Sequence, residues 1–417
     1  MAAVNLSSGY TIRQQRTSAR FFYLVDAIGC LFEPTPTQLA ALDSSYRSTG
    51  DFLSECAEFN GLLQEIHAHG SRQLGTLVRP IDESREGFDV DLVARLDQVA
   101  MRKYGGTDGP VRLLNDLFSA LERYARTHGL RIHRWERCVT LEYAGSMFAD
   151  IAPVIDEPAL VGLYGGTQGR IPDRELHRYD ITNPRGYARA YDKAASVPPN
   201  FTSYAEFTEA LKAEARADVV PLPAPQEVFD RLLSRLVQLL KLHRNVAFGS
   251  AVGGEDLSPS SIFLTTLAAA AYAVQAPRPH DSPLDLLLDI VDTLSDHFER
   301  TRHPDGSETW TLPNPSAPAE NLASGMNTQQ RQAAFQSWHR RVSDDVTAIV
   351  DSIENNVGMD VLLARIEKAF GPRASLAIRD DQIQRRLGNR QAGHVALFPV
   401  VGAPMSAIAR SHNFFGR

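Results

Sequence analysis

Two short motifs between residues 61 and 95 restrict the fold and the chemistry of this chain more than any other part of it. The first is the pair Gly70-Ser71, which follows the strand-like EIHAH and opens SRQLGTLV, a segment that favours a short helix. The second is Asp89-x-Asp91, which lies among apolar, strand-forming residues. Because successive side chains of a strand point to opposite faces, the two carboxylates share one face.

Both motifs have a physical interpretation as parts of one site. Two ionised carboxylates side by side repel each other, and a chain tolerates this mainly where a divalent cation neutralises them. A helix start offers unpaired backbone N–H groups to phosphate, and a glycine there lets the backbone approach closely. We therefore interpret residues 61–95 as a site for a nucleoside triphosphate and magnesium. Either motif alone would favour the alternative, a turn followed by a solvated acidic strand end.

Asp150 is the candidate for a third carboxylate of this site. It lies in the apolar, strand-like segment MFADIAPVI, where a carboxylate normally needs a partner. One partner would be an arginine such as Arg137. The other would be a metal ion shared with Asp89 and Asp91, if neighbouring strands bring the three residues together. Glu142 and Asp156 are weaker candidates, because each lies near a strand end where water solvates it.

Three carboxylates beside a glycine-serine turn predict nucleotidyl transfer. One divalent ion lowers the pKa of an attacking hydroxyl, and a second binds the triphosphate and stabilises the departing pyrophosphate. The sequence contains no Walker A loop, no Gly-x-Ser-x-Gly elbow, no His-Glu-x-x-His and no Gly-x-Gly-x-x-Gly after a strand.

The rest of the chain predicts a mixed α/β first half and an all-helical second half. Residues 1–33 leave helix and strand both open. RIHRWERCVTLEYA and MFADIAPVI predict two strands around Gly145-Ser146, and residues 161–200 predict a loop-dominated crossing between lobes. Helices are expected after a cap at Thr37, from Pro110 to Gly129, over EVFDRLLSRLVQLLKLHRN, after a cap at Ser258 or Ser260, over SPLDLLLDIVDTLSDHFE, and over residues 329–369. Lys241, His243 and Arg244 are expected at the C-terminal end of their helix, where the helix dipole favours cations.

The overall charge and the cysteines limit the function classes further. The formal net charge is -7, so no global positive field holds nucleic acid by its phosphates. Three widely spaced cysteines argue against a disulfide framework and a structural zinc site, and fit a reducing cytoplasm. No apolar run reaches the length of a membrane span or of a signal peptide. We expect a cytoplasmic protein with no membrane segment.

The motifs, taken in order, resemble the polymerase-beta-type nucleotidyltransferase superfamily: GSRQLGTLVRP, then FDVDLV, then FADIAPVI. Later segments, among them RLVQLLKLHRN, PSSIFLTTLAA and NPSAPAENLA, are similar to the bacterial cGAS/DncV-like nucleotidyltransferases of CBASS anti-phage defence. The resemblance implies an α+β, bilobal fold with a twisted mixed sheet and a C-terminal helical bundle. It implies a nucleotidyltransferase core with an N-terminal helix over residues 1–195, a helical lobe over 196–400 and a tail over 401–417.

The resemblance also implies roles for individual residues. Asp89, Asp91 and Asp150 match the family's catalytic ligands of two Mg²⁺ ions, for which Mn²⁺ is an alternative. Gly70 and Ser71 match the pair that contacts the donor triphosphate. Lys241 matches a lysine that binds the triphosphate from the other lobe, and Ser261 matches a serine that opens the next helix and contacts nucleotide.

The implied partners are ATP, GTP or UTP as substrates and CBASS regulatory proteins at the C-terminal tail. The closing RSHNFFGR either serves such a partner or docks its two phenylalanines on the body of the protein. A DNA activator is not expected, because the chain has neither the cysteine spacing of a zinc module nor the charge.

The favoured function is synthesis of a cyclic di- or oligonucleotide second messenger from NTPs, with release of pyrophosphate. One alternative is a linear product, either oligoadenylate or a nucleotide added to an RNA end. Another is a nucleotide-binding scaffold without catalytic activity.

Overall fold

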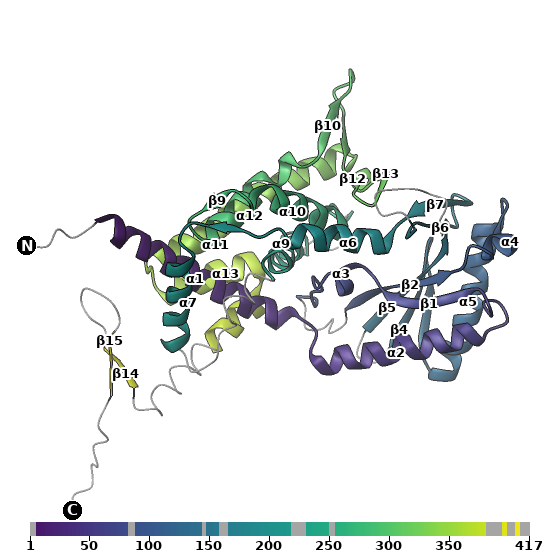
Figure 1. The fold of residues 1–417 in the computed structure, drawn as a ribbon, viewed down its shortest axis with the longest axis horizontal. Helices are drawn as coiled ribbons and strands as arrows, with labels where there is room; N and C mark the ends of the chain where they lie inside the picture. The colour runs from purple at the N-terminus through teal and green to yellow at the C-terminus, as the bar shows by residue number, and fades with distance from the viewer. Residues whose placement is uncertain are drawn as a thin grey trace, which may run out of the picture.

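The computed structural model describes residues 6–81, 88–143, 147–157, 166–217, 231–249, 255–380, 394–397 and 405–408. Two lobes lie side by side in Figure 1, one built on a β-sheet and one built of helices. The bilobal α+β fold expected from the sequence is therefore confirmed. The predictions for the RSHNFFGR tail fall outside the described residues.

The sheet lobe carries seven strands in the order β1-β2-β5-β4-β3, and β6 and β7 continue from β5. β2 and β5 run parallel, and the other neighbouring strands run antiparallel. The strands are β1 (Leu63–Ala68), β2 (Asp89–Leu96), β3 (Arg131–Arg134), β4 (Val139–Tyr143), β5 (Met147–Asp156), β6 (Gly169–Asp173) and β7 (Arg178–Thr182). The segment RIHRWERCVTLEYA thus forms two strands, not the predicted one, because the Trp135 N–H donates to the Cys138 carbonyl and closes a turn.

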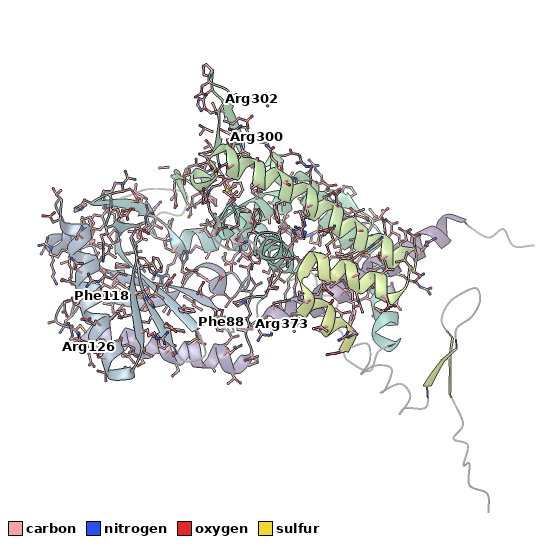
Figure 2. All side chains as sticks on the ribbon, turned by 180° about the vertical axis from the view of Figure 1, so that it is seen from behind. Phe88, Phe118, Arg126, Arg300, Arg302 and Arg373 are labelled. Carbon is pink, nitrogen blue, oxygen red and sulfur yellow. The ribbon has the colours of Figure 1, made fainter. Side chains whose placement is uncertain are left out.

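One face of this sheet is buried and the other faces the helical lobe. Alternate residues of β2, β5 and β4 pack against α2 (Pro36–Glu55) and α5 (Gly109–His128). α5 begins with Pro110 in its first turn and ends at Gly129 in the left-handed conformation, as predicted. Figure 2 shows Phe118 and Arg126 on α5, at the side of the sheet away from the helical lobe. The residues between the buried ones, Asp89, Asp91 and Asp150 among them, therefore point to the other face.

The helical lobe surrounds a second core. Its helices are α1 (Leu6–Phe32), α6 (Pro184–Ala195), α7 (Tyr204–Ala217), α9 (Leu232–Phe248), α10 (Ser261–Gln275), α11 (Pro283–Thr293), α12 (Gln329–Glu354) and α13 (Met359–Phe370). Two short helices, α3 (Gly70–Gln73) and α4 (Ala100–Tyr104), belong to the sheet lobe. Residues 1–33, which the sequence left open, thus contain a long helix, and it packs against α7, α9 and α12. α2 is capped by Thr35, not by the predicted Thr37.

The all-helical second half expected from the sequence is wrong. Short strands interrupt it: β8 (Asn200–Phe201), β9 (Pro279–His280), β10 (Glu299–Arg302), β11 (Glu308–Thr311), β12 (Pro313–Asn314), β13 (Ala317–Asn321), β14 (His394–Leu397) and β15 (Met405–Ile408). The β10–β11 hairpin projects from the lobe with Arg300 and Arg302 on it (Figure 2). The Pro-rich segment that follows cannot propagate a helix, and the side chains of Asn321 and Asn327 satisfy its backbone instead.

Residues 161–200 are also more ordered than the predicted loop, because they contain β6, β7 and α6. Asn183 caps α6 by accepting from the Gly186 N–H at 2.9 Å. The Asn183 side chain also donates to the Ser316 carbonyl, and the Ser316 hydroxyl donates back to the Asn183 carbonyl. These buried bonds tie the junction of the two lobes to β12 and β13. The described residues contain no helix with the length and hydrophobicity of a membrane span.

Candidate active site

The parallel pairing of β2 and β5 brings the three predicted aspartates together. Asp91 lies directly opposite Asp150 in the register, and Asp89 precedes Asp91 by two residues on the same face. Asp150 accepts a hydrogen bond from the Thr140 hydroxyl of β4. Arg137, the alternative partner, forms ion pairs with Asp173 and Asp180 instead. Asp150 therefore remains available to the open face of the sheet.

The three carboxylates influence one another electrostatically. Burial and the nearby Asp150 raise the pKa of Asp89. Burial, Asp150 and Asp89 raise the pKa of Asp91 to about 6, with Lys241 opposing the rise. In the arrangement of the described residues, no three His, Cys, Asp or Glu side chains close around one point tightly enough to hold a metal ion. The three aspartates lie side by side on one face of the sheet.

The glycine of Gly70-Ser71 is required by its contact with Asp91. Gly70 has a φ of +55°, a left-handed conformation that disfavours other residues. A Cβ at this position would lie 2.1 Å from Asp91 Oδ2. The His69 N–H also donates to the Asp91 carbonyl at 2.8 Å. The predicted short helix after β1 is confirmed, and it begins at Gly70 itself.

Lys241 reaches the site from the helical lobe. α9 continues to Phe248, so Lys241 lies inside the helix and not at the predicted C-terminal end. Its side chain is buried, and its Nζ donates to the carbonyl and the hydroxyl of Thr76 at 3.1 and 3.0 Å. Burial, followed by Arg244, lowers the pKa of Lys241 to about 7, and Asp91 opposes this. His243 points elsewhere, to Asp345 in α12.

Ser261 is the first residue of α10, and Ser260 is its N-cap, one of the two caps considered from the sequence. The Arg244 guanidinium donates to the Ser261 hydroxyl and to the Pro259 carbonyl, both at 3.0 Å, and to Asn245 Oδ1. Burial lowers the pKa of Arg244. Sequence reasoning assigned no site role to Arg244 or Asn245. The signal for Arg244 was its position three residues after Lys241, which places both on one helix face.

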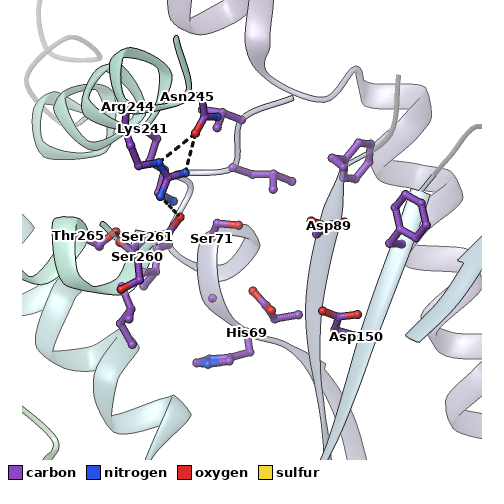
Figure 3. Close-up of a pocket in the computed structure, with 18 of the residues that line it drawn as sticks. His69, Ser71, Asp89, Asp150, Lys241, Arg244, Asn245, Ser260, Ser261 and Thr265 are labelled. Carbon is purple, nitrogen blue, oxygen red and sulfur yellow. Dashed lines mark hydrogen bonds between the residues drawn. The ribbon is translucent and has the colours of Figure 1, made fainter. Parts of the chain in front are cut away.

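These residues line a cleft of about 980 Å³ between the lobes. Figure 3 shows Lys241, Arg244 and Ser261 on the side of the helical lobe, Ser71 between the lobes, and Asp89 and Asp150 on the sheet. All seven site residues predicted from the sequence belong to the lining of this cleft. His69, Phe148 and Tyr187 also contribute to the lining and were not singled out from the sequence.

Comparisons with known proteins agree on the fold. Residues 32–194 match the model of the Second Messenger Oligonucleotide or Dinucleotide Synthetase domain. The cyclic dinucleotide synthase CdnG of Bradyrhizobium diazoefficiens is 25% identical over 357 residues, which cover 79% of this chain and 78% of that protein.

Two solved structures are similar to the whole two-lobed chain. The structure of CdnG from the same organism in complex with GTP has a TM-score of 0.62 at 20% identity, covering 86% of this chain and 97% of that one. The CdnC:HORMA-deltaN complex of E. coli MS115-1 has a TM-score of 0.52 at 15% identity, with coverages of 86% and 97%. At these identities the likeness shows a shared fold.

Proposed function

We infer that this chain is a cGAS/DncV-like nucleotidyltransferase that joins nucleoside triphosphates into a cyclic di- or oligonucleotide second messenger, releasing pyrophosphate, in anti-phage signalling. The observation that carries this inference is the pairing of Asp91 with Asp150 beside Gly70. This pairing places the proposed metal ligands next to the Gly70-Ser71 turn that is proposed to bind phosphate. GTP, which is bound in the CdnG structure, is one proposed substrate. ATP and UTP are others.

The donor triphosphate is proposed to bind between Gly70-Ser71 and the helical lobe. The Ser71 hydroxyl and the backbone of the turn lie on one wall, and Lys241 and Ser261 lie on the other. A triphosphate would compete with Thr76 for the Lys241 ammonium and favour its charged form, because a nearby negative charge raises the pKa of a lysine. Arg244 acts on this site through Ser261, whose hydroxyl it holds.

Enzymes of this family depend on divalent metal ions. The carboxylate oxygens of Asp89, Asp91 and Asp150 suit Mg²⁺ or Mn²⁺. Burial, followed by the neighbouring carboxylates, raises the pKa values of Asp89 and Asp91, and a bound cation would favour their charged forms. We propose that the three residues hold two ions. Bound there, the ions would lower the pKa of the attacking hydroxyl and neutralise the departing pyrophosphate.

Regulation through protein partners is also proposed, with the C-terminal tail as the contact. CdnC was solved with a HORMA protein, so a protein of this fold binds a second chain. The test is removal of residues 401–417. If the shortened protein releases pyrophosphate at the basal rate but is no longer activated by its partner, the tail is supported as the contact.

The test of the function is product analysis. Purified protein with the four NTPs and Mg²⁺ should release pyrophosphate and form products that resist phosphatase, and Asp89→Ala or Asp150→Ala should abolish both. Asp156→Ala is the matched control, because Asp156 lies on the same face of β5 but pairs with Arg95 at 2.6 Å. Phosphatase-sensitive products would indicate linear synthesis instead. Nucleotide binding without pyrophosphate release would indicate a scaffold.

A further inference from the structure

Trp135 is the one exposed tryptophan of the three in the sequence. It lies in the turn between β3 and β4 and is 54% exposed, whereas Trp310 and Trp338 are buried in the helical lobe. Its backbone is fixed by the N–H bond to the Cys138 carbonyl at 3.1 Å. A large, flat aromatic side chain is thus held by an ordered turn with about half of its surface accessible to a ligand.

The Trp135 side chain is connected to the catalytic aspartates. Its indole Nε1 donates to the Thr140 hydroxyl at 2.7 Å, and that hydroxyl donates to Asp150. In the sheet register, Asp91 lies opposite Asp150, and Asp150 lies opposite Thr140. The indole is therefore joined through Thr140 to the third carboxylate, with its only hydrogen-bonding group occupied and about half of the residue exposed.

This position is on the opposite side of the aspartates from the proposed phosphate wall. Ser71, Lys241 and Ser261 lie toward β1, α9 and α10, and β4 lies beyond Asp150 in the other direction. Phosphoryl transfer places the attacking and leaving oxygens roughly in line. If the pyrophosphate leaves toward Lys241, the attacking hydroxyl approaches from the side of Asp150, and the rest of the acceptor nucleotide extends over β4.

We propose that Trp135 is the platform on which the base of the acceptor nucleotide stacks during the transfer. The inference rests on the function proposed above and adds an acceptor-positioning residue to it. Stacking on an aromatic ring tolerates every base, because each base has a π face. The hydrogen bond from the indole to Thr140 fixes the position of the ring relative to Asp150. A base stacked on the ring would therefore hold the sugar hydroxyl of its nucleotide at a fixed distance from the Asp150 carboxylate. The other exposed aromatic residue among the described large apolar side chains, Tyr204, lies on α7 in the helical lobe.

The kinetic test measures the KM for the acceptor nucleotide separately from the KM for the donor. A labelled NTP serves as donor, and each of the four nucleoside 5′-monophosphates serves as an acceptor that has no triphosphate to donate. Trp135→Ala should raise the KM for the monophosphate by roughly 5-fold to 140-fold, the range that loss of one base stack predicts. The KM for the donor should stay within about twofold. Trp135→Phe keeps a ring and should recover most of the acceptor affinity. Thr140→Val keeps the Trp135 ring but removes the hydroxyl that accepts its hydrogen bond. This variant should lower kcat by a larger factor than it raises the KM for the acceptor.

A second measurement does not depend on turnover. Because Trp310 and Trp338 are buried, acrylamide quenching of tryptophan fluorescence reports mainly on Trp135. A monophosphate added to protein saturated with a non-hydrolysable NTP should protect this fluorescence from acrylamide, and Trp135→Phe should abolish the protected signal. An unchanged acceptor KM in Trp135→Ala, or equal quenching with and without monophosphate, would overturn the proposal. Absence of pyrophosphate release from the wild-type protein would count against the proposed function, while the quenching result would still decide the role of Trp135.

Discussion

Substitution of Gly70 by alanine tests whether the phosphate turn and the acidic strand act as one site. The added Cβ would lie 2.1 Å from Asp91 Oδ2, whereas real Cβ atoms essentially never approach within 3.0 Å, so the two atoms must separate by about 0.9 Å (3.0 − 2.1). A misplacement of about 1 Å in a reacting constellation can lower the rate by about 100-fold. The left-handed φ of +55° adds roughly 1–2 kcal/mol of conformational strain for a residue with a Cβ.

Gly75→Ala is the matched control for this substitution. Gly75 lies just after α3 with a φ of +66°, but a Cβ at that position would meet nothing nearer than Ser234 Oγ at 4.0 Å. Both variants should therefore lose a similar free energy of unfolding, about 1–2 kcal/mol, from the left-handed backbone. Only Gly70→Ala should lose pyrophosphate release, by about 100-fold in kcat, because only it displaces Asp91.

The assay combines thermal unfolding with initial rates of pyrophosphate release at saturating NTP and Mg²⁺. Raising the Mg²⁺ concentration should not restore Gly70→Ala, because the defect lies in the position of a ligand. Equal residual rates for the two alanine variants would refute the reasoning, since they would show that the contact between Gly70 and Asp91 does not matter for the reaction.

Three further predictions concern charge and packing. Asp91→Asn should stabilise the metal-free protein by about 1–3 kcal/mol at pH 7 and not at pH 4, as measured by chemical denaturation. The reason is that the pKa of Asp91 is about 6 in the folded protein and 3.8 in the unfolded chain, so folding disfavours the charged carboxylate above pH 6. Lys241→Met should weaken binding of the donor NTP. The wild type should also become more stable between about pH 7 and pH 10, because the folded pKa of Lys241 is about 7, the unfolded value is 10.5, and the unfolded chain therefore binds the extra proton in this range. Lys241→Met should lack this rise, and identical plots of stability against pH for the two proteins would contradict the prediction. Gly29→Ala should lower the free energy of unfolding by roughly 1–3 kcal/mol, because its Cβ would lie 2.3 Å from the buried Arg235 guanidinium. Gly50→Ala is the control, because a Cβ there would lie no nearer than 3.7 Å to Ile66. It should raise the free energy of unfolding by about 0.5–1 kcal/mol, since alanine has the higher helix propensity.

The ion pairs of Arg235 join the N-terminal helix to the segment that follows α3 in the cleft between the lobes. Arg235 pairs with Asp26 at 2.7 Å and with Glu33 at 2.9 Å, and its neighbour Gln238 donates to the carbonyls of Gly75 and Leu77. Breaking a buried ion pair by removing one partner typically costs several kcal/mol. Through Arg235 and Gln238, α1 therefore supports the segment that follows α3, a role that the sequence pattern of residues 1–33 could not indicate.

Local patterns in the sequence were sufficient for the strand that carries Asp89 and Asp91, for the turn at Gly70, and for the helix closed by Gly129, because neighbouring residues specify each of these features. Local patterns failed where long-range contacts decide the conformation. The Pro-rich segment after Trp310 forms the paired strands β12 and β13, and the Asn321 side chain accepts from the Leu312 N–H at its start. α9 continued past Lys241 because the helix is enclosed by other helices.

The sequence by itself determined which residues are the candidates for metal and phosphate binding, since residue type and alternation along a strand are local properties. Only the tertiary structure decided how they meet. The parallel pairing of β2 with β5 places Asp91 against Asp150, and α9 brings a buried lysine from another lobe to face them. Pairing and packing of this kind depend on contacts between segments far apart in the chain, which spacing along one segment cannot encode.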